Sequence, residues 1–582
     1  MKAWEEAIPV SHAHVQKQRR LGASLMLSAQ FIDECIQFAK SYEETQSSVD
    51  QDATISSIIT ASTVSSLGFS RDAASSATHH TPDPLAVSNA EAQSYYAGLH
   101  SEPTLLYRTS KKQWSPPSGP EAQRHLKELR EVFTHPITKV WNHDLAWKVV
   151  KVMDAHTIRF TTIDVVRFKE VGVDEAPEDG EEDEDDETVE AKKPVAGPVT
   201  IWIGVFPEFT SATAAHNAAQ NVLALLSDYQ VTDVDIEYRE SFYTREAGPR
   251  LLQPVDGLDP LVDVEANVDY VCHPGAPSRD VLLLGKGAFT NLADSIKLMI
   301  GRHGIMVKRW RKQIEVFVER EKGTNTINAE KAKEVRIETR GLLDKAENAM
   351  EAIGALLNWV NKDWKKLDNR VLGDVLRSPA ISLGAGEHRF TEDWGIFKVN
   401  RDKLGDGFQG NKLDLGTKLT PDEFTVKCFP RGDANWEFEY PHDRLLPLIG
   451  TMTDELMRAP DMWYSDGEPC LLVAKSGNAT GTTLGRANGV FSIVRDYFTN
   501  LSVNQTSMEW GIINYDSKSE VFSEPGDSGS IIADIRGRIG GMLTGGSGKT
   551  KSSDMTYATP FWWLLQRIRT NGFPNAHLNV FT

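Results

Sequence analysis

Phe522-Ser523-Glu524-Pro525-Gly526-Asp527-Ser528-Gly529-Ser530 is the stretch that decides how the C-terminal region is interpreted. A serine flanked by glycines, on a turn ahead of the apolar run Ile531-Ile532-Ala533, presents its hydroxyl outward beside free backbone N–H groups. Acyl transfer needs this arrangement, because the hydroxyl attacks and the N–H groups stabilise the oxyanion. The α/β-hydrolase motif Gly-x-Ser-x-Gly is excluded, since position 530 is Ser. The stretch therefore predicts Ser528 as a nucleophile.

Gly526-Asp527-Ser528-Gly529 followed by a small residue resembles the nucleophile loop of the chymotrypsin/trypsin-like serine proteases (PA clan). The resemblance implies an oxyanion hole made by the N–H groups of Gly526 and Ser528. In secreted relatives the aspartate before the serine pairs with a newly cut N-terminus. Asp527 is not expected to do so here, because long N-terminal regions precede this part of the chain.

Further segments resemble the second barrel of this family. The glycine-rich run Leu471 to Gly485 is similar to its hairpin, Trp510 to Ile513 to the strand before the serine loop, and Arg538 to Gly546 to the strand lining the specificity pocket. Thr556 to Pro560 and the apolar segment Phe561 to Ile568 are similar to its last strand and C-terminal helix. The implied pocket residues are Phe522, Thr544, Gly545 and Gly546. Phe522, at the base of that pocket, argues against a basic residue at the cleavage site.

The resemblance also implies a catalytic acid. Phe390 to Val399 is similar to the strand that the acid opens, with Gly395 where the family has Ala, and Asp393 is the implied acid. The Thr-Ala-x-His motif of the general base is not found upstream. Of the nearby histidines, His303 falls in a helical pattern, His388 is too close to the acid, and His273 follows a strand-like run but precedes Pro274. His273 is the candidate base.

The predicted fold class is a multidomain α+β protein. An N-terminal helical segment (1–43) and a disordered Ser/Thr/Ala-rich linker (44–99) precede an α+β module (100–250), which contains an acidic loop (174–190). Three further parts follow: a partial first β-barrel (251–286), an antiparallel helical hairpin insertion (287–368) and a trypsin-like barrel region (369–582). The hairpin is predicted because its apolar residues recur at spacings of three and four. The first barrel is short, so the chain either lacks a segment or is a degenerate protease.

Within the α+β module, two strands are expected over 146–152 and 157–168, around Asp154-Ala155-His156. A helix is expected from Thr210 to Leu226. Period-2 alternation over Val231 to Tyr238 then places Asp233, Asp235 and Glu237 on one strand face. Such carboxylates either bind a divalent cation, act as a glycosidase acid/base set, or form an ordinary solvated face.

Composition limits the function and the compartment. The formal charge of −19 argues against a nucleic-acid partner, and no apolar run is long enough to suggest a membrane span. The 4 cysteines are widely separated, and the start of the chain does not resemble a secretory signal. We therefore expect an intracellular protein, cytoplasmic or nuclear and not secreted. No cofactor and no metal are expected.

Three functions remain at this point, and the last of them is the carboxylate-metal or glycosidase activity of the 100–250 module. The first is a trypsin-like serine peptidase with a peptide or protein substrate, impaired because the histidine motif is missing. The second is a catalytically dead pseudoprotease that binds a peptide or protein ligand or acts as a scaffold. The resemblance supplies a fold but no substrate, and the sequence leaves the oligomeric state open.

Overall fold

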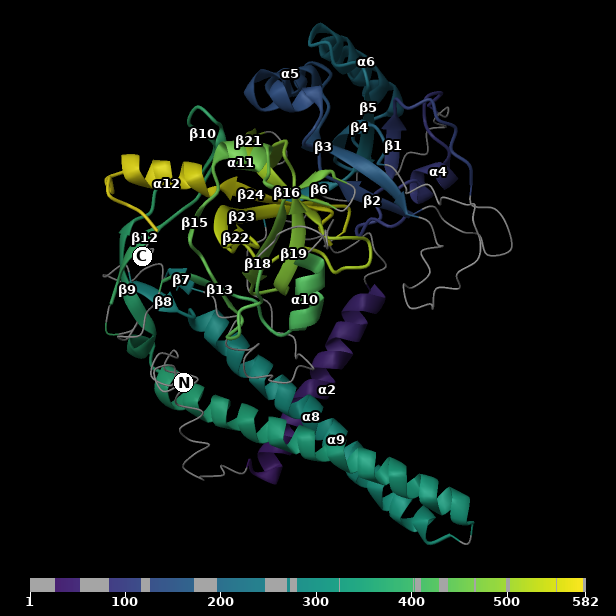
Figure 1. Cartoon of the computed structure of the whole chain (residues 1–582), viewed down its shortest axis with the longest axis vertical. Helices are drawn as coiled ribbons and strands as arrows, with labels where there is room; N and C mark the ends of the chain where they lie inside the picture. Colours follow the sequence, from purple (N-terminus) through teal and green to yellow (C-terminus); the bar gives the residue numbers. More distant parts are fainter. Residues whose placement is uncertain are drawn as a thin grey trace, which may run out of the picture.

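The computed structural model describes residues 27–52, 83–116, 126–171, 196–245, 270–272, 280–323, 325–400, 402, 410–428, 438–464, 467–498, 503–550 and 552–578. The architecture is mixed α+β, and its largest sheet is mostly antiparallel (Figure 1). The strand path β1-β5-β4-β3-β20-β21-β19-β18-β22-β23-β15 joins the N-terminal module to the C-terminal region. The acidic loop expected over 174–190 lies outside the described residues.

The N-terminal module is a sheet with helices. Its elements are α4 (Asn89–Ser94), β1 (Leu105–Arg108), β2 (Leu126–Arg130), η2 (Pro136–Lys139), η3 (Trp141–Leu145), α5 (Ala146–Ala155), β3 (Phe160–Val171), β4 (Val199–Val205), α6 (Ala212–Asp228), β5 (Val234–Glu240) and β6 (Phe242–Arg245). The strand predicted over 146–152 is wrong, because this segment is the helix α5. Its buried residues, Ala146, Val149, Val150 and Met153, recur at helical spacing. The predicted helix from Thr210 to Leu226 is confirmed as α6.

Helices occupy parts of the range 44–99 in which a disordered linker was expected, and residues 53–82 lie outside the described residues. Helix α2 (Ala29–Asp52) continues to Asp52, and α4 forms within the same range. Tyr96 is buried against Phe168 and Trp202. Local composition, which is rich in Ser, Thr and Ala, did not reveal that these aromatic residues belong to the core of the module.

Two long helices, α8 (Lys286–Glu321) and α9 (Thr326–Trp359), pack on one another and extend away from the sheets (Figure 1). They are followed by η4 (Val360–Trp364) and η5 (Leu367–Arg370). In the chain the helices lie between two paired strands of a second sheet, ordered β12-β9-β8-β7: β7 (Tyr270–Cys272), β8 (Asp280–Leu283), β9 (Val371–Arg377) and β12 (Ile396–Val399). Helix α2 crosses α8 closely, since a Cβ on Gly301 would lie 2.1 Å from the Cys35 carbonyl oxygen.

The C-terminal region contains six strands whose antiparallel pairings close into a ring. The order is β21-β24-β23-β22-β18-β19 and back to β21. The strands are β18 (Leu472–Gly477), β19 (Gly481–Ala487), β21 (Val503–Asn514), β22 (Ile531–Asp534), β23 (Arg538–Gly548) and β24 (Met555–Pro560), with α12 (Phe561–Thr570) after the last. The predicted 471–485 hairpin is confirmed as β18 and β19, and the strands and helix predicted after residue 509 are present.

Shorter elements surround the ring. They are β10 (Ser382–Ala385), β11 (Phe390–Glu392), β13 (Lys412–Asp414), α10 (Pro421–Cys428), β14 (Leu445–Pro447), β15 (Gly450–Thr451), α11 (Asp454–Arg458), β16 (Met462–Trp463), β17 (Pro469–Cys470) and β20 (Ser492–Phe498). The single strand predicted from Phe390 to Val399 is divided, because residues 393–395 separate β11 from β12.

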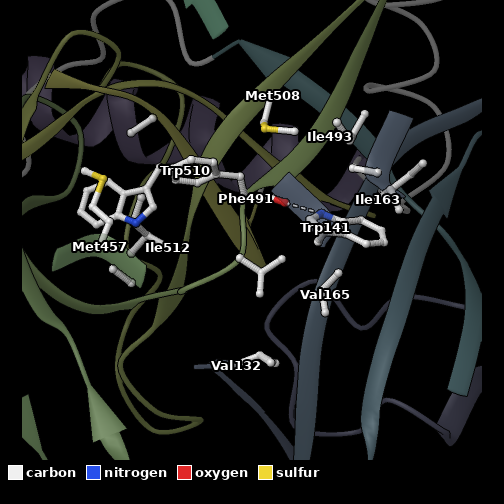
Figure 2. Close-up of a cluster of buried hydrophobic side chains, with 14 of the residues drawn as sticks. Val132, Trp141, Ile163, Val165, Met457, Phe491, Ile493, Met508, Trp510 and Ile512 are labelled. Carbon is white, nitrogen blue, oxygen red and sulfur yellow. Dashed lines mark hydrogen bonds between the residues drawn. The ribbon is translucent and has the colours of Figure 1, made fainter. Parts of the chain in front are cut away.

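An apolar core joins the N-terminal module to the C-terminal region. Trp141 is fully buried, and its indole N–H donates to the Phe491 carbonyl at 2.8 Å (Figure 2). Ile163 of β3 pairs with Ile493 of β20, which extends the sheet across the junction. The two parts therefore share one core rather than being joined by a linker alone.

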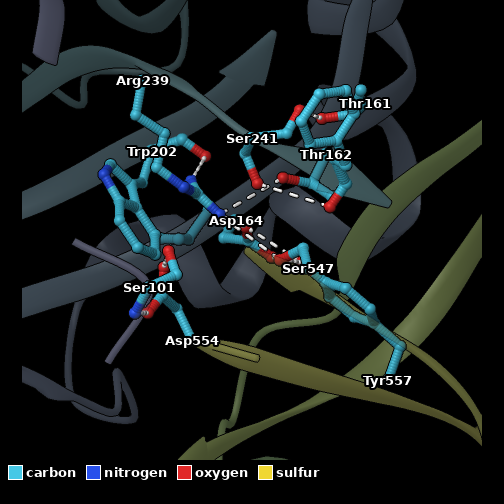
Figure 3. A network of polar contacts seen from close by, with 12 residues as sticks. Ser101, Thr161, Thr162, Asp164, Trp202, Arg239, Ser241, Ser547, Asp554 and Tyr557 are labelled. Carbon is cyan, nitrogen blue, oxygen red and sulfur yellow. Dashed lines mark hydrogen bonds and ion pairs between the residues drawn. The ribbon is translucent and has the colours of Figure 1, made fainter. Parts of the chain in front are cut away.

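A buried polar network lies at the same junction (Figure 3). Arg239 Nη2 is 3.3 Å from Asp164 Oδ2, and both side chains are fully buried. The Tyr557 hydroxyl donates to Asp164 Oδ1 at 3.0 Å, and Arg239 also lies 3.4 Å from the Ser547 hydroxyl. Arg239 lies on β5, whereas Tyr557 lies on β24 and Ser547 on β23. This network therefore holds β5, and the strand β6 that follows it, against the C-terminal strands.

Candidate serine site

The serine loop presents Ser528 to solvent. Ser528 is exposed, whereas the preceding residue Asp527 is fully buried. Gly526 and Gly529 have φ values of 116° and 86°, which side-chain-bearing residues rarely adopt. These two glycines are therefore needed for the sharp change of direction that places the serine outward and the aspartate inward.

Backbone hydrogen bonds, including one from Asp527 N–H to the Glu524 carbonyl at 3.1 Å, hold the loop in place. Gly529 N–H donates to the Leu543 carbonyl at 2.8 Å, and Leu543 N–H donates to the Ser530 carbonyl at 3.0 Å. Within the loop, Ser530 N–H donates to the Asp527 carbonyl at 3.0 Å. Within the described ranges the N–H groups of Gly526 and Ser528 donate no backbone hydrogen bond, and Gly526 itself is buried.

A buried ion pair supports the loop from below. Lys475 Nζ lies 3.1 Å from Asp527 Oδ2, and both side chains are fully buried. Thr480 Oγ1 donates to Asp527 Oδ2 at 2.7 Å, and the N–H groups of Ala479 and Glu524 donate to the same carboxylate at 2.7 and 3.1 Å. Although burial alone would raise it, the pKa of Asp527 is held below its usual value by the Lys475 charge and these hydrogen bonds.

Lys475 is a residue that sequence reasoning missed. It lies on β18 directly after the apolar run Leu471 to Ala474. A lysine at the end of such a run is buried only when it is paired, and that pattern was the available signal. Gly477 belongs to the same arrangement, because a Cβ there would lie 2.3 Å from Asp527 Oδ1.

The residues predicted to line a specificity pocket lie close to the loop. Phe522 is fully buried, and its N–H donates to Asn514 Oδ1 at 2.7 Å. Thr544 is buried, and its hydroxyl donates to the Tyr557 carbonyl at 3.2 Å. Gly545 and Gly546 pair with Arg245 and Thr244 of β6. Strand β6 of the same chain therefore pairs along the edge of β23 at the two glycines predicted to line the pocket.

Asp393, the predicted acid, directly follows β11. The residue is exposed as a whole, but partial desolvation of its carboxyl group raises its pKa, and the nearby Arg245 opposes this shift. Arg245 pairs with Gly545, only two positions beyond Leu543, which contacts the serine loop. These interactions connect Asp393 to Arg245, and no described hydrogen bond joins Asp393 to the serine loop.

The general base is not identified. His273 lies outside the described residues. His388 stacks on Phe390 and packs against Trp562, with ring centroids 5.7 and 5.1 Å apart, and His303 lies within α8. Among the histidines that the structure describes, none is hydrogen-bonded to Ser528 or Asp393.

The carboxylates of β5 do not converge on one point. Glu237 is buried and accepts hydrogen bonds from the hydroxyls of Tyr95 and Tyr96 at 2.5 and 2.8 Å. Asp233 contacts His135 at 3.1 Å, and Asp235 contacts Thr109 at 3.4 Å. Over the described ranges, no group of three or more His, Cys, Asp or Glu side chains is placed to hold a metal ion. Nor does any helix there combine the length and apolarity needed to cross a membrane.

No protein-family model matches the chain, and no curated protein is significantly similar to it.

Proposed function

We propose that the C-terminal region is a trypsin-like serine peptidase unit in which Ser528 accepts the acyl group of a peptide substrate. The observation that supports this most is the loop itself: an exposed serine hydroxyl lies beside two N–H groups without described acceptors, above the buried pair of Asp527 and Lys475. The closed ring of six antiparallel strands supports the same proposal, since barrels of this kind form that fold.

The chemistry follows from the positions of these groups. The Ser528 hydroxyl attacks the carbonyl carbon of the substrate, and the resulting oxyanion accepts hydrogen bonds from the N–H groups of Gly526 and Ser528. The hydroxyl proton passes to an imidazole, for which His273 is the candidate, and Asp393 orients that imidazole. Without such a base, only the catalysis due to the oxyanion hole and substrate binding remains.

A burst experiment with p-nitrophenyl acetate tests this proposal. An acyl-enzyme at Ser528 releases p-nitrophenolate in a rapid phase, approaching one equivalent per chain, before slow turnover. Ser528→Ala removes this phase, whereas Ser530→Ala, two positions further along the same loop, retains it. The proposal is wrong if well-folded wild-type protein and Ser528→Ala release p-nitrophenolate at the same rate.

A second function, peptide binding without catalysis, is favoured by one specific observation. Among the described histidines, none has a described hydrogen bond to Ser528 or Asp393. A barrel that has lost its base can retain its peptide-binding surface while acyl transfer falls to a residual level. Absence of the burst together with measurable peptide binding would favour this function.

A further inference from the structure

The N-terminus of the long helix α8 is not capped by a side chain. Gly285 is the N-cap residue and makes no side-chain cap hydrogen bond, and the first turn contains no acidic residue. The first bond of the helix runs from the Phe289 N–H to the Gly285 carbonyl at 2.8 Å. The N–H groups before Phe289 therefore lack acceptors within the helix, and together with the helix dipole they favour a negative charge at this end.

A sharp turn joins this helix to strand β8. Leu284, between the end of β8 and Gly285, has a φ of 59°, which a bulky residue rarely adopts. The strand, this turn and the segment Gly285-Lys286-Gly287 follow one another directly in the chain. A strand that leads through glycines into a helix is an arrangement in which backbone N–H groups approach a phosphate closely.

Arg370, at the end of η5, lies against the same turn. The residue is only 4% exposed, and its Nη1 donates to the Leu284 carbonyl at 2.6 Å. Its guanidinium carbon lies 4.4 Å from the centre of the Phe289 ring, which belongs to the first turn of α8. The guanidinium is therefore held at the N-terminus of the helix.

The positive charge of Arg370 has no negative partner in the part of the chain that the structure describes. Its buried Nε donates to no described acceptor, and no described carboxylate forms an ion pair with the guanidinium. Burial alone lowers the pKa of Arg370, and no described charge opposes this shift. Because an unpaired buried charge loses its hydration without compensation, buried charges are normally paired. An anion from solution would supply the missing partner.

The first turn of α8 is open to such an anion. Gly287 is exposed, and a Cβ built on it would meet no atom of another part of the chain within 4 Å. A tetrahedral oxyanion can therefore reach the N–H groups of the turn from solvent, while the Arg370 charge lies next to the same turn. Phosphate suits this arrangement, because it accepts several charge-assisted hydrogen bonds at once.

We propose that the N-terminus of α8, with Arg370 beside it, binds the phosphate group of inorganic phosphate or of a small phosphomonoester. The N–H groups of the first turn bind the phosphate oxygens, and the guanidinium balances their charge. Arg370 precedes β9 and Leu284 follows β8, so the bound phosphate also supports the two paired strands between which the helical hairpin is inserted. This site does not involve Ser528 and does not rest on the proposed function.

Isothermal titration calorimetry of the full chain with inorganic phosphate, at constant ionic strength, tests the site. Arg370→Met should weaken binding by about tenfold or more, because it removes a charged group beside the phosphate. Lys365→Met, which removes an exposed lysine shortly before Arg370, should bind phosphate like the wild type. A second titration with glycerol phosphate distinguishes the sources: tighter binding of the monoester indicates a phosphorylated small molecule as ligand, and weaker binding indicates free phosphate.

Substitutions of Gly287 provide a test that does not depend on the folding of Arg370→Met. Gly287→Glu places a carboxylate at the first turn, where it competes with phosphate for the same positive end of the helix. Gly287→Gln, its uncharged counterpart, should therefore bind phosphate about tenfold or more tightly than Gly287→Glu. Equal phosphate affinities for this pair and for wild type and Arg370→Met, or no saturable binding of either probe to well-folded wild-type protein, would overturn the inference.

Discussion

Replacing Lys475 by Met should destabilise the serine loop more than the loss of an ordinary surface lysine. Lys475 and Asp527 are 3.1 Å apart and fully buried, so the substitution leaves an uncompensated carboxylate in the interior. Removal of one partner of a buried pair costs about 3–5 kcal/mol. Because Ala479, Thr480 and Glu524 still donate hydrogen bonds to the carboxylate, we expect the lower end of that range, about 3 kcal/mol.

Urea unfolding followed by tryptophan fluorescence measures this effect as a shift in the transition midpoint. Lys418→Met is the matched control, since Lys418 also contacts the same hairpin, through the Thr480 carbonyl, but its side chain is 32% exposed. The control should lose less than about 1 kcal/mol. Adding Asp527→Asn to Lys475→Met removes the buried charge and should recover part of the lost stability.

The pH dependence provides an independent check of the same pair. The pKa of Asp527 is lower in the folded protein than in the unfolded chain, so the pair stabilises the fold above the unfolded pKa of about 3.9 and the contribution is lost as the pH falls through the folded pKa. The difference between wild type and Lys475→Met should therefore be largest near neutral pH and shrink in acid. A Lys475→Met variant as stable as the control at pH 7 would refute this reasoning.

Three further predictions concern other parts of the molecule. Burial raises the pKa of Glu509 to about 7, so the free energy of unfolding should fall by up to roughly 3 kcal/mol as the pH rises from 5 to 8, and Glu509→Gln should abolish this dependence in urea titrations. Trp141→Ala should cost about 3–5 kcal/mol, because the indole is fully buried at the junction and its hydrogen bond to Phe491 is lost; urea unfolding would show this. Gly301→Leu should separate α2 from α8, since a Cβ would lie 2.1 Å from the Cys35 carbonyl oxygen, and limited proteolysis should then cleave α2 faster than in the wild type.

The C-terminal strands could be predicted because their signals are local. The hairpin of β18 and β19 follows from glycines at 477 and 481, which pair with each other at the turn. The serine turn follows from Gly526 and Gly529, both of which have positive φ. In these segments the conformational need and the residue type coincide, so short motifs are informative.

Other features depend on contacts that a local pattern does not contain. The valines of α5 favour a strand by intrinsic preference, but burial of Val149 and Met153 on one face makes the segment a helix. The pairing of β6 with β23 joins residues about 300 positions apart, and nothing in Phe242 to Arg245 specifies Gly545 as a partner. The burial of Lys475 has a local signal in the apolar run before it, but its pairing with Asp527 has none.

Mapping the adduct of a fluorophosphonate probe by mass spectrometry is the most direct test of Ser528 as an activated nucleophile. Tryptic cleavage after Lys518 and Arg536 releases one peptide that contains Ser519, Ser523, Ser528 and Ser530, so fragmentation of that peptide identifies the modified serine. We predict a single adduct at Ser528, absent from Ser528→Ala and retained in Ser530→Ala. Well-folded wild-type protein that forms no adduct, or forms it at another serine, would contradict the account.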